Sequence, residues 1–406
     1  MQLSKRNVRT WIISASAFAA VMAISGCSSD GDFGSKSSNA TSSIPITCNG
    51  MELSDPAGSR EHAEAITSSP SPHAYGFTED EASLHTPAPR DINQFGEFDG
   101  KQRANDSSGS QANFQQHTFV NEGFDGDVAV DPTGHWLVFT STRHSTHPQI
   151  YLQRVDGNAV TQLTSDNSDY AFPSFSPDGK QIAFSSTRAG NWDIYVMDVD
   201  GRNVVQVTNT PAQDLHPSFS PDGHRLVFSS MGPRSRQWEL WTADANTGEH
   251  RMIGTGLFPT WSPNKDKDQI AFQRARQRGS RWFSLWTLDL VAGEARNVTE
   301  VAVSSNAAIV SPAWSPDGHK LAFSTIVDPA YTDPKGRPTG QQDVWIVRAD
   351  GTNRQRLTDG TGVNATPFWS RDGRVFFVSD RGGVECVWSA QANSVDVPVA
   401  DTRDHE

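Results

Sequence analysis

Three residues of this chain carry side chains that could act as an acid or a base at matching points of its sequence: Asp125, Asp214 and His216. Chemistry on a sugar polymer would need such carboxylates or histidines to converge on one place. Polar groups that cap strands explain the same positions without catalysis. The chain has no G-x-S-x-G or H-E-x-x-H pattern, and its 12 histidines have no paired metal-binding spacing. We therefore predict no catalytic residue, no cofactor and no metal ion.

A group of basic and aromatic residues offers binding chemistry instead. Four arginines fall within one short stretch that ends at Trp282: Arg274, Arg276, Arg278 and Arg281. This composition suits anionic or peptide ligands. Tyr331 lies in the longest connection, residues 325–342, where three prolines stiffen the chain around an aromatic anchor. The alternative is that these arginines are solvated loop residues paired with nearby acids.

A sequence motif repeated six times predicts the strands and turns that must position these residues. Each copy is a turn of the Ser-Pro-Asp-Gly type followed by an apolar run, and the copies begin at residues 131, 176, 220, 262, 315 and 370. By subtraction, successive copies are 45, 44, 42, 53 and 55 residues apart. Strand-like repeats of about 40 to 50 residues are typical of β-propellers and stacked solenoids.

Each copy divides into four strands. In the second copy, residues 173–176 and 181–185 form one hairpin, and residues 194–197 and 204–208 form another. The second strands carry three apolar residues in a row, so both of their faces must be covered, as happens between neighbouring blades of a ring. We expect an all-β fold, a six-bladed β-propeller over residues 115–400.

The ring can be closed from either end of the domain. Residues 115–119 stand before the first copy as residues 204–208 stand before the third, so an N-terminal strand could complete the last blade. The tail at residues 394–400 has the same relation to Trp388 and could complete it instead. Either arrangement removes an exposed sheet edge.

The two faces of the predicted disc differ in chemistry. The Pro-Asp-Gly turns share one face, which we call the turn face, and the connections between second and third strands share the other, the loop face, with the links between blades. The loop face is more variable and is expected to bind the partner. Residues just before the first strands are expected at the mouth of a central channel: Asp125, Asp127, Tyr170, Phe172, Asp214, His216, Phe258, Asn364 and Thr366.

The repeat resembles that of the TolB family of periplasmic propellers. The resemblance lies in the Ser-Pro-Asp-Gly turns, the Ser-Thr-Arg loop starts at 141–143 and 186–188, the strand at 193–198 and the Leu-Thr ending at 357–358, and it covers roughly residues 115–400. It implies the propeller fold, which peptidases also carry as a separate domain. TolB proteins have a small α/β domain before the propeller, and nothing here resembles it, so membership of a Tol complex stays open.

The first residues predict the compartment. A basic region with Lys5, Arg6 and Arg9 precedes an apolar stretch of about a dozen residues that ends in Ile-Ser-Gly before Cys27. This stretch is short for a membrane span and indicates an export signal over residues 1–26. The ending resembles a bacterial lipobox, which implies lipidation of Cys27 and, with Ser28 next, placement at the outer membrane facing the periplasm. An ordinary signal peptide is the alternative.

Composition and charge limit the remaining possibilities. Residues 27–114 are rich in Ser, Gly, Asp, Asn and Pro and predict a disordered tether. Without the signal, 31 basic against 47 acidic residues leave a net charge of −16, which disfavours nucleic acid. Cys386 either pairs with Cys48 or is a buried free thiol. We expect a lipid-anchored monomer that binds an envelope protein, peptide or glycan; the alternative is a propeller-type polysaccharide lyase or glycosidase.

Overall fold

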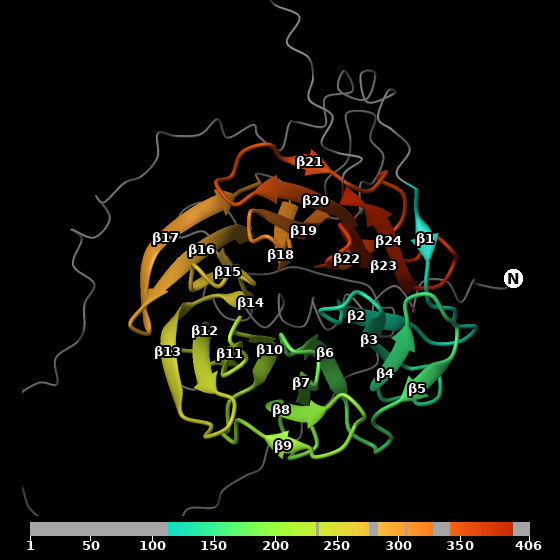
Figure 1. Ribbon diagram of the computed structural model, residues 1–406, viewed down its shortest axis with the longest axis horizontal. Coiled ribbons are helices and arrows are strands. Elements are labelled where there is room, and N and C mark those ends of the chain that lie inside the picture. Colours follow the sequence, from blue (N-terminus) through green and yellow to red (C-terminus); the bar gives the residue numbers. More distant parts are fainter. Residues whose placement is uncertain (1–112, 233–234, 276–282, 305–306, 328–341, 393–406) are drawn as a thin grey trace, which may run out of the picture. The chain divides into compact units, whose positions relative to one another are not determined.

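The computed structural model describes residues 113–232, 235–275, 283–304, 307–327 and 342–392, and these form a ring of six four-stranded antiparallel sheets (Figure 1). The prediction of an all-β, six-bladed propeller is confirmed. In each blade the first strand lies innermost and the fourth lies at the rim. Among the described residues, no helix has the length and hydropathy needed to cross a bilayer.

The strands of the first three blades are β2 (Asp125–Val130), β3 (Trp136–Ser141), β4 (Gln149–Arg154) and β5 (Val160–Gln162); β6 (Tyr170–Phe175), β7 (Gln181–Ser186), β8 (Asp193–Asp198) and β9 (Val205–Gln206); and β10 (Asp214–Phe219), β11 (Arg225–Met231), β12 (Trp238–Asp244) and β13 (His250–Thr255). The strands of the last three are β14 (Leu257–Trp261), β15 (Gln269–Ala275), β16 (Phe283–Val291) and β17 (Glu294–Ala302); β18 (Ala307–Trp314), β19 (Lys320–Val327), β20 (Gln342–Arg348) and β21 (Gln355–Arg356); and β22 (Asn364–Trp369), β23 (Arg374–Ser379), β24 (Cys386–Gln391) and β1 (Gln115–Gln116).

The N-terminal strand β1 closes the ring. It pairs with β24 at Gln115↔Ser389 and Gln116↔Trp388, so the sixth blade has the order β1-β24-β23-β22. Thr118 extends the pairing, because its Oγ1 accepts a hydrogen bond from the backbone N of Val387 at 2.9 Å. Of the two closures that the sequence left open, the N-terminal one is present; the tail at residues 394–400 lies outside the described residues.

The core of the molecule lies between blades. The apolar second-strand runs are buried on both faces, and Phe139, Phe184 and Phe323 have no exposed surface. One cluster joins Val138 and Ile150 of the first blade to Ile182 and Phe184 of the second, as the three-residue apolar pattern predicts. Cys386 is buried in β24 and is a free thiol in the part of the chain that the structure describes; Cys48 lies outside that part.

The repeated turn is stabilised by its own side chains. Ser176 Oγ donates a hydrogen bond to Asp178 Oδ1 at 2.7 Å and accepts one from the backbone N of Gln181 at 3.0 Å. Gly179 has φ +72, a left-handed conformation that favours glycine. The same serine–aspartate bond recurs at Ser220–Asp222 and Ser315–Asp317. These hydrogen bonds lower the pKa of each turn aspartate. The carboxylates of the turn face therefore act mainly in holding turns.

Candidate functional site

Each innermost strand carries a β-bulge with one residue in a left-handed conformation. Six residues share this geometry: Asp127 (φ 46), Phe172 (φ 54), His216 (φ 60), Phe258 (φ 50), Ser311 (φ 52) and Thr366 (φ 46). In every case the pairing with the second strand shifts at this point. A bulge re-aims a side chain, and the inner strands of successive blades contact one another around the axis. We call these six residues the axial ring.

The axial ring was partly foreseen from the sequence. Asp127, Phe172, His216, Phe258 and Thr366 were predicted at the channel mouth, whereas Ser311 was missed. A signal for Ser311 existed, because every axial residue stands four positions before the first residue of the repeated turn, and five of the six are followed by proline. Proline fits here because a bulge leaves its backbone nitrogen without a ladder partner.

One half of the axial ring is filled by three aromatic rings that are tilted against one another. The His216 ring lies 3.9 Å from Phe172 and 4.0 Å from Phe258, measured between ring centroids. His216 is 7% exposed, and neither of its ring nitrogens has a hydrogen-bond partner among the described residues. Burial lowers the pKa of His216 to about 3, so its imidazole stays neutral at physiological pH. A neutral histidine packed between two phenylalanines serves here as a flat aromatic side chain.

The other half of the axial ring is polar. Asp127 Oδ2 accepts hydrogen bonds from Thr140 Oγ1 at 3.3 Å and from the backbone N of Phe172 at 3.4 Å, both long for bonds to a carboxylate. Asp127 keeps part of its accessible surface because it faces the axis, yet the surrounding protein displaces enough water to raise its pKa to about 6. Ser311 and Thr366 also keep accessible surface, although Thr366 Oγ1 itself is buried and has no hydrogen-bond partner among the described residues.

The two other predicted acid–base residues are buried away from solvent. Asp125 has no exposed surface and accepts two hydrogen bonds from Arg143 Nη2, at 2.8 and 2.9 Å. Asp214 is 1% exposed, and its Oδ1 atom has no hydrogen-bond partner in the described ranges. The register explains this difference, because Gly232 in the third blade takes the place that Arg143 takes in the first. Burial raises the pKa of Asp214.

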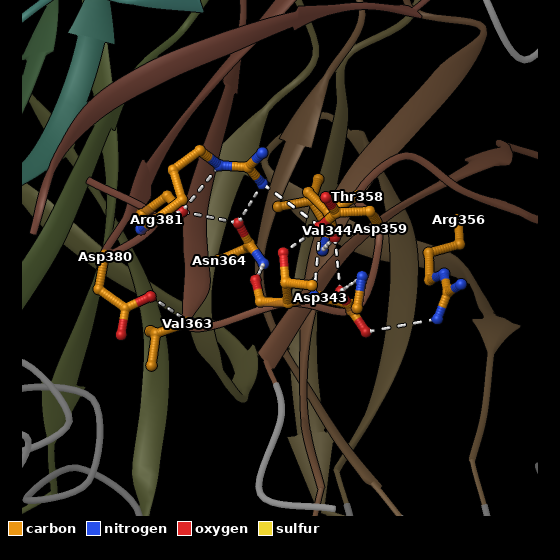
Figure 2. A network of polar contacts seen from close by, with 12 residues as sticks. Asp343, Val344, Arg356, Thr358, Asp359, Val363, Asn364, Asp380 and Arg381 are labelled. Carbon is orange, nitrogen blue, oxygen red and sulfur yellow. Dashed lines mark hydrogen bonds and ion pairs between the residues drawn. The ribbon is translucent and has the colours of Figure 1, made fainter. Parts of the chain in front are cut away.

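A polar network joins the fifth and sixth blades on the loop face (Figure 2). Arg381 Nη2 donates to Asn364 Oδ1 at 3.0 Å and lies 3.6 Å from Asp359 Oδ1, while its guanidinium stacks over the ring of Phe114 at 3.6 Å. In the fifth blade, Thr358, which follows β21, donates a hydrogen bond from its Oγ1 to Oδ1 of Asp343 in β20 at 2.7 Å. Arg143 and Arg381, which begin loops between second and third strands, thus pair with nearby acids. This agrees with the alternative interpretation, in which the basic loop residues stabilise the structure.

The predicted arginine cluster is described in part. Arg274 lies in β15, half-buried, with its guanidinium 5.7 Å from the centroid of the Trp286 ring. Burial lowers the pKa of Arg274. The remaining predicted binding residues, and the lipidation site, lie outside the described residues: Arg276, Arg278, Arg281, Tyr331 and Cys27.

Two family models match this chain in overlapping parts. Residues 134–284 match a model described as the Tricorn protease N-terminal beta propeller domain, and residues 235–405 match one described as the TolB beta propeller domain. Two curated relatives are each described as "Tol-Pal system protein TolB". The one from Alcanivorax borkumensis is 33% identical over 89 residues, which are 22% of this chain and 18% of the relative. The one from Anaeromyxobacter sp. strain K is 29% identical over 163 residues, and the match covers 31% of this chain and 35% of the relative.

The match therefore spans 18% of the length of the Alcanivorax relative and 35% of the length of the Anaeromyxobacter relative. Among solved structures, TolB from Acinetobacter baumannii is similar with a TM-score of 0.50 and 19% identity over 76% of this chain and 71% of that chain. A tricorn protease structure has a TM-score of 0.50 and 16% identity over 67% of this chain and 26% of that chain. At these identities the two structures support the fold.

Proposed function

Because the chain belongs to the TolB-like β-propeller family, we propose that it is an interaction scaffold of the cell envelope that binds a protein partner on its loop face. The observation that carries the proposal is the contrast between the two faces. On the turn face, three of the six repeated turns hold a serine and an aspartate that bond to each other. The loop face brings together the axial ring, the unequal connections between second and third strands, and the links between blades.

The sequence left three classes of partner open: an envelope protein, a peptide and a glycan. Of these we propose a protein. The relatives from Alcanivorax and Anaeromyxobacter are named as proteins of the Tol-Pal system, which assigns them to an assembly with other proteins. Asp127 and Phe172, which keep accessible surface in the axial ring, suit a partner that presents a basic and partly apolar group.

We also propose that a lipid on Cys27 tethers the propeller to the outer membrane, with the propeller in the periplasm. The basic, apolar and small-residue order before Cys27 supports this anchor. Labelling of cells with an alkyne fatty acid should mark the wild-type protein and leave Cys27→Ser unmarked. Equal labelling of both proteins would show that Cys27 is not the acylated residue.

The lyase alternative draws no support from the three acid–base residues that the sequence analysis named. Asp125 is held by Arg143, Asp214 has almost no accessible surface, and His216 is buried with a pKa of about 3. None of the three presents a proton donor or acceptor to a polysaccharide at neutral pH. Incubation with uronic-acid polymers tests the alternative directly, because a lyase would release unsaturated products.

Photo-crosslinking in living cells tests the proposed face. A photoreactive amino acid is placed at Ala189, exposed on the loop face, and in a matched variant at Lys180, exposed on the turn face. We expect Ala189 to capture a defined envelope protein and Lys180 to capture none. Capture from Lys180 with none from Ala189 would place the partner on the opposite face.

A further inference from the structure

We propose that four neighbouring residues of the axial ring, Ser311, Thr366, Asp127 and Phe172, form a binding site for a primary ammonium group on an aliphatic stem. We call these four residues the open arc. This inference rests on the proposed function, because the ammonium would belong to the protein that docks on the loop face. A free N-terminus and a lysine side chain both supply this chemistry.

Accessibility separates the open arc from the rest of the axial ring. Its four residues follow one another around the axis, in the fifth, sixth, first and second blades, and all keep accessible surface. His216 and Phe258 complete the ring and are 7% and 6% exposed. Centroid distances of 3.9 and 4.0 Å show that large side chains at successive axial positions touch. Ser311 and Thr366 occupy corresponding positions with short side chains. They therefore leave room for a ligand, whereas on the opposite side of the axis the aromatic rings fill the corresponding space.

The open arc carries one carboxylate that lacks a cationic partner. Among the described residues, no lysine, arginine or histidine forms an ion pair with Asp127, in contrast to Asp125, which pairs with Arg143 at 2.8 Å. Both hydrogen bonds to Asp127 reach a single oxygen, Oδ2, and both exceed 3.2 Å. A partly enclosed carboxylate so weakly compensated favours the arrival of a positive charge. His216 is neutral and does not repel one.

The acceptors of the open arc match an ammonium group better than other cations. An ammonium has three donors and one charge, and the arc offers the Asp127 carboxylate and the hydroxyls of Ser311 and Thr366. Thr366 Oγ1 is buried without a partner and would gain one. The Phe172 ring can lie against the aliphatic stem or the cation. Within the described ranges, no group of three or more His, Cys, Asp or Glu could hold a metal ion, so a single carboxylate suits a monovalent ligand.

Binding of n-butylammonium to the full-length protein tests the inference. We expect saturable binding by calorimetry at pH 7.5, a loss of about 10- to 100-fold in affinity in Asp127→Asn, and a loss on the order of 10-fold in Thr366→Val. Asp266→Asn removes an exposed carboxylate from the turn face and is the matched control, which should bind as the wild type does. Equal binding of 1-butanol, or unchanged affinity in Asp127→Asn, would overturn the proposal, as would preferential binding of Ca²⁺ at the same site.

Peptides separate the two sources of the ammonium. Acetyl-Ala-Lys-Ala-amide carries a lysine alone, Ala-Ala-Ala-amide carries a free N-terminus alone, and acetyl-Ala-Ala-Ala-amide carries neither. Binding of one or both of the first two, lost in Asp127→Asn, supports the site, and equal binding of the third contradicts it. Crosslinking from Ala189 keeps the two proposals apart: persistent capture without any ammonium binding refutes the open arc alone, whereas absent capture refutes the docking face.

Discussion

Replacing Asp127 by asparagine should stabilise the protein at neutral and alkaline pH. Asparagine keeps the size and the acceptor of the side chain, and it tolerates the left-handed backbone of this position, φ 46, so the substitution changes little besides the charge. Burial raises the pKa of Asp127 from 3.8 to about 6. The folded state therefore holds a proton that the unfolded state has released, and folding stability falls as pH rises through this interval.

The magnitude follows from the two pKa values. The interval from 3.8 to about 6, at about 1.36 kcal/mol for each pKa unit, corresponds to about 3 kcal/mol once the pH is well above 6. Between pH 4.5 and pH 7.5 the stability of Asp127→Asn relative to the wild type should grow by about 2 kcal/mol. At pH 7.5 the melting temperature should rise by roughly 5 °C for a propeller of this size.

Urea unfolding at a series of pH values measures this difference. The variant and the wild type are compared with Asp266→Asn, which removes an exposed carboxylate on the turn face. A pH-independent difference for Asp127→Asn, or a variant less stable than the wild type at pH 7.5, would refute the electrostatic account of the axial ring. With n-butylammonium present the gain should shrink, because the ligand stabilises the wild type alone.

Three further predictions address the ring and its closure. Burial lowers the pKa of His216 to about 3, so its contribution to stability falls as pH drops from 6.5 towards 3; in the Asp127→Asn background, His216→Phe should flatten this acid limb in urea titrations. Thr118→Val removes the hydroxyl that accepts from Val387 N and should cost about 1–3 kcal/mol in urea unfolding, whereas exposed Thr247→Val should cost far less. Deleting the chain through residue 121 should lower the melting temperature of the whole propeller and keep one transition, since the rim strand of the sixth blade is lost; separate transitions would contradict cooperative closure.

The sequence predicted the blades well because each repeat carries its own local signals. A Pro-Asp-Gly turn and a three-residue apolar run specify a hairpin buried on both faces, and six copies specify a ring. The axial positions were predicted less completely. Ser311 has an ordinary side chain, and its importance comes from a left-handed bulge, φ 52, that aligns it with five residues from other blades. A fixed distance to the turn, four residues in every copy, would have found it.

Ion pairing of the buried acids could not be predicted from the sequence, for a physical reason. Asp125 and Asp214 look equivalent in the sequence, yet Asp125 pairs with Arg143, whereas Asp214 forms no ion pair with any residue that the structure describes, and Gly232 stands at the place that corresponds to Arg143. Which of several nearby arginines reaches a buried acid depends on the register of strands and on connections of unequal length. The sequence therefore indicated the region of the site without separating the accessible Asp127 from the buried Asp125.

Closure by β1 has a mechanical consequence. The chain that leads back towards Cys27 enters the ring at β1, which pairs with β24 at two residues. If Cys27 is anchored, tension between the membrane and a docked partner would load this short strand first. The sixth blade would then open first under force, at a lower load than the five blades whose four strands are continuous in the chain.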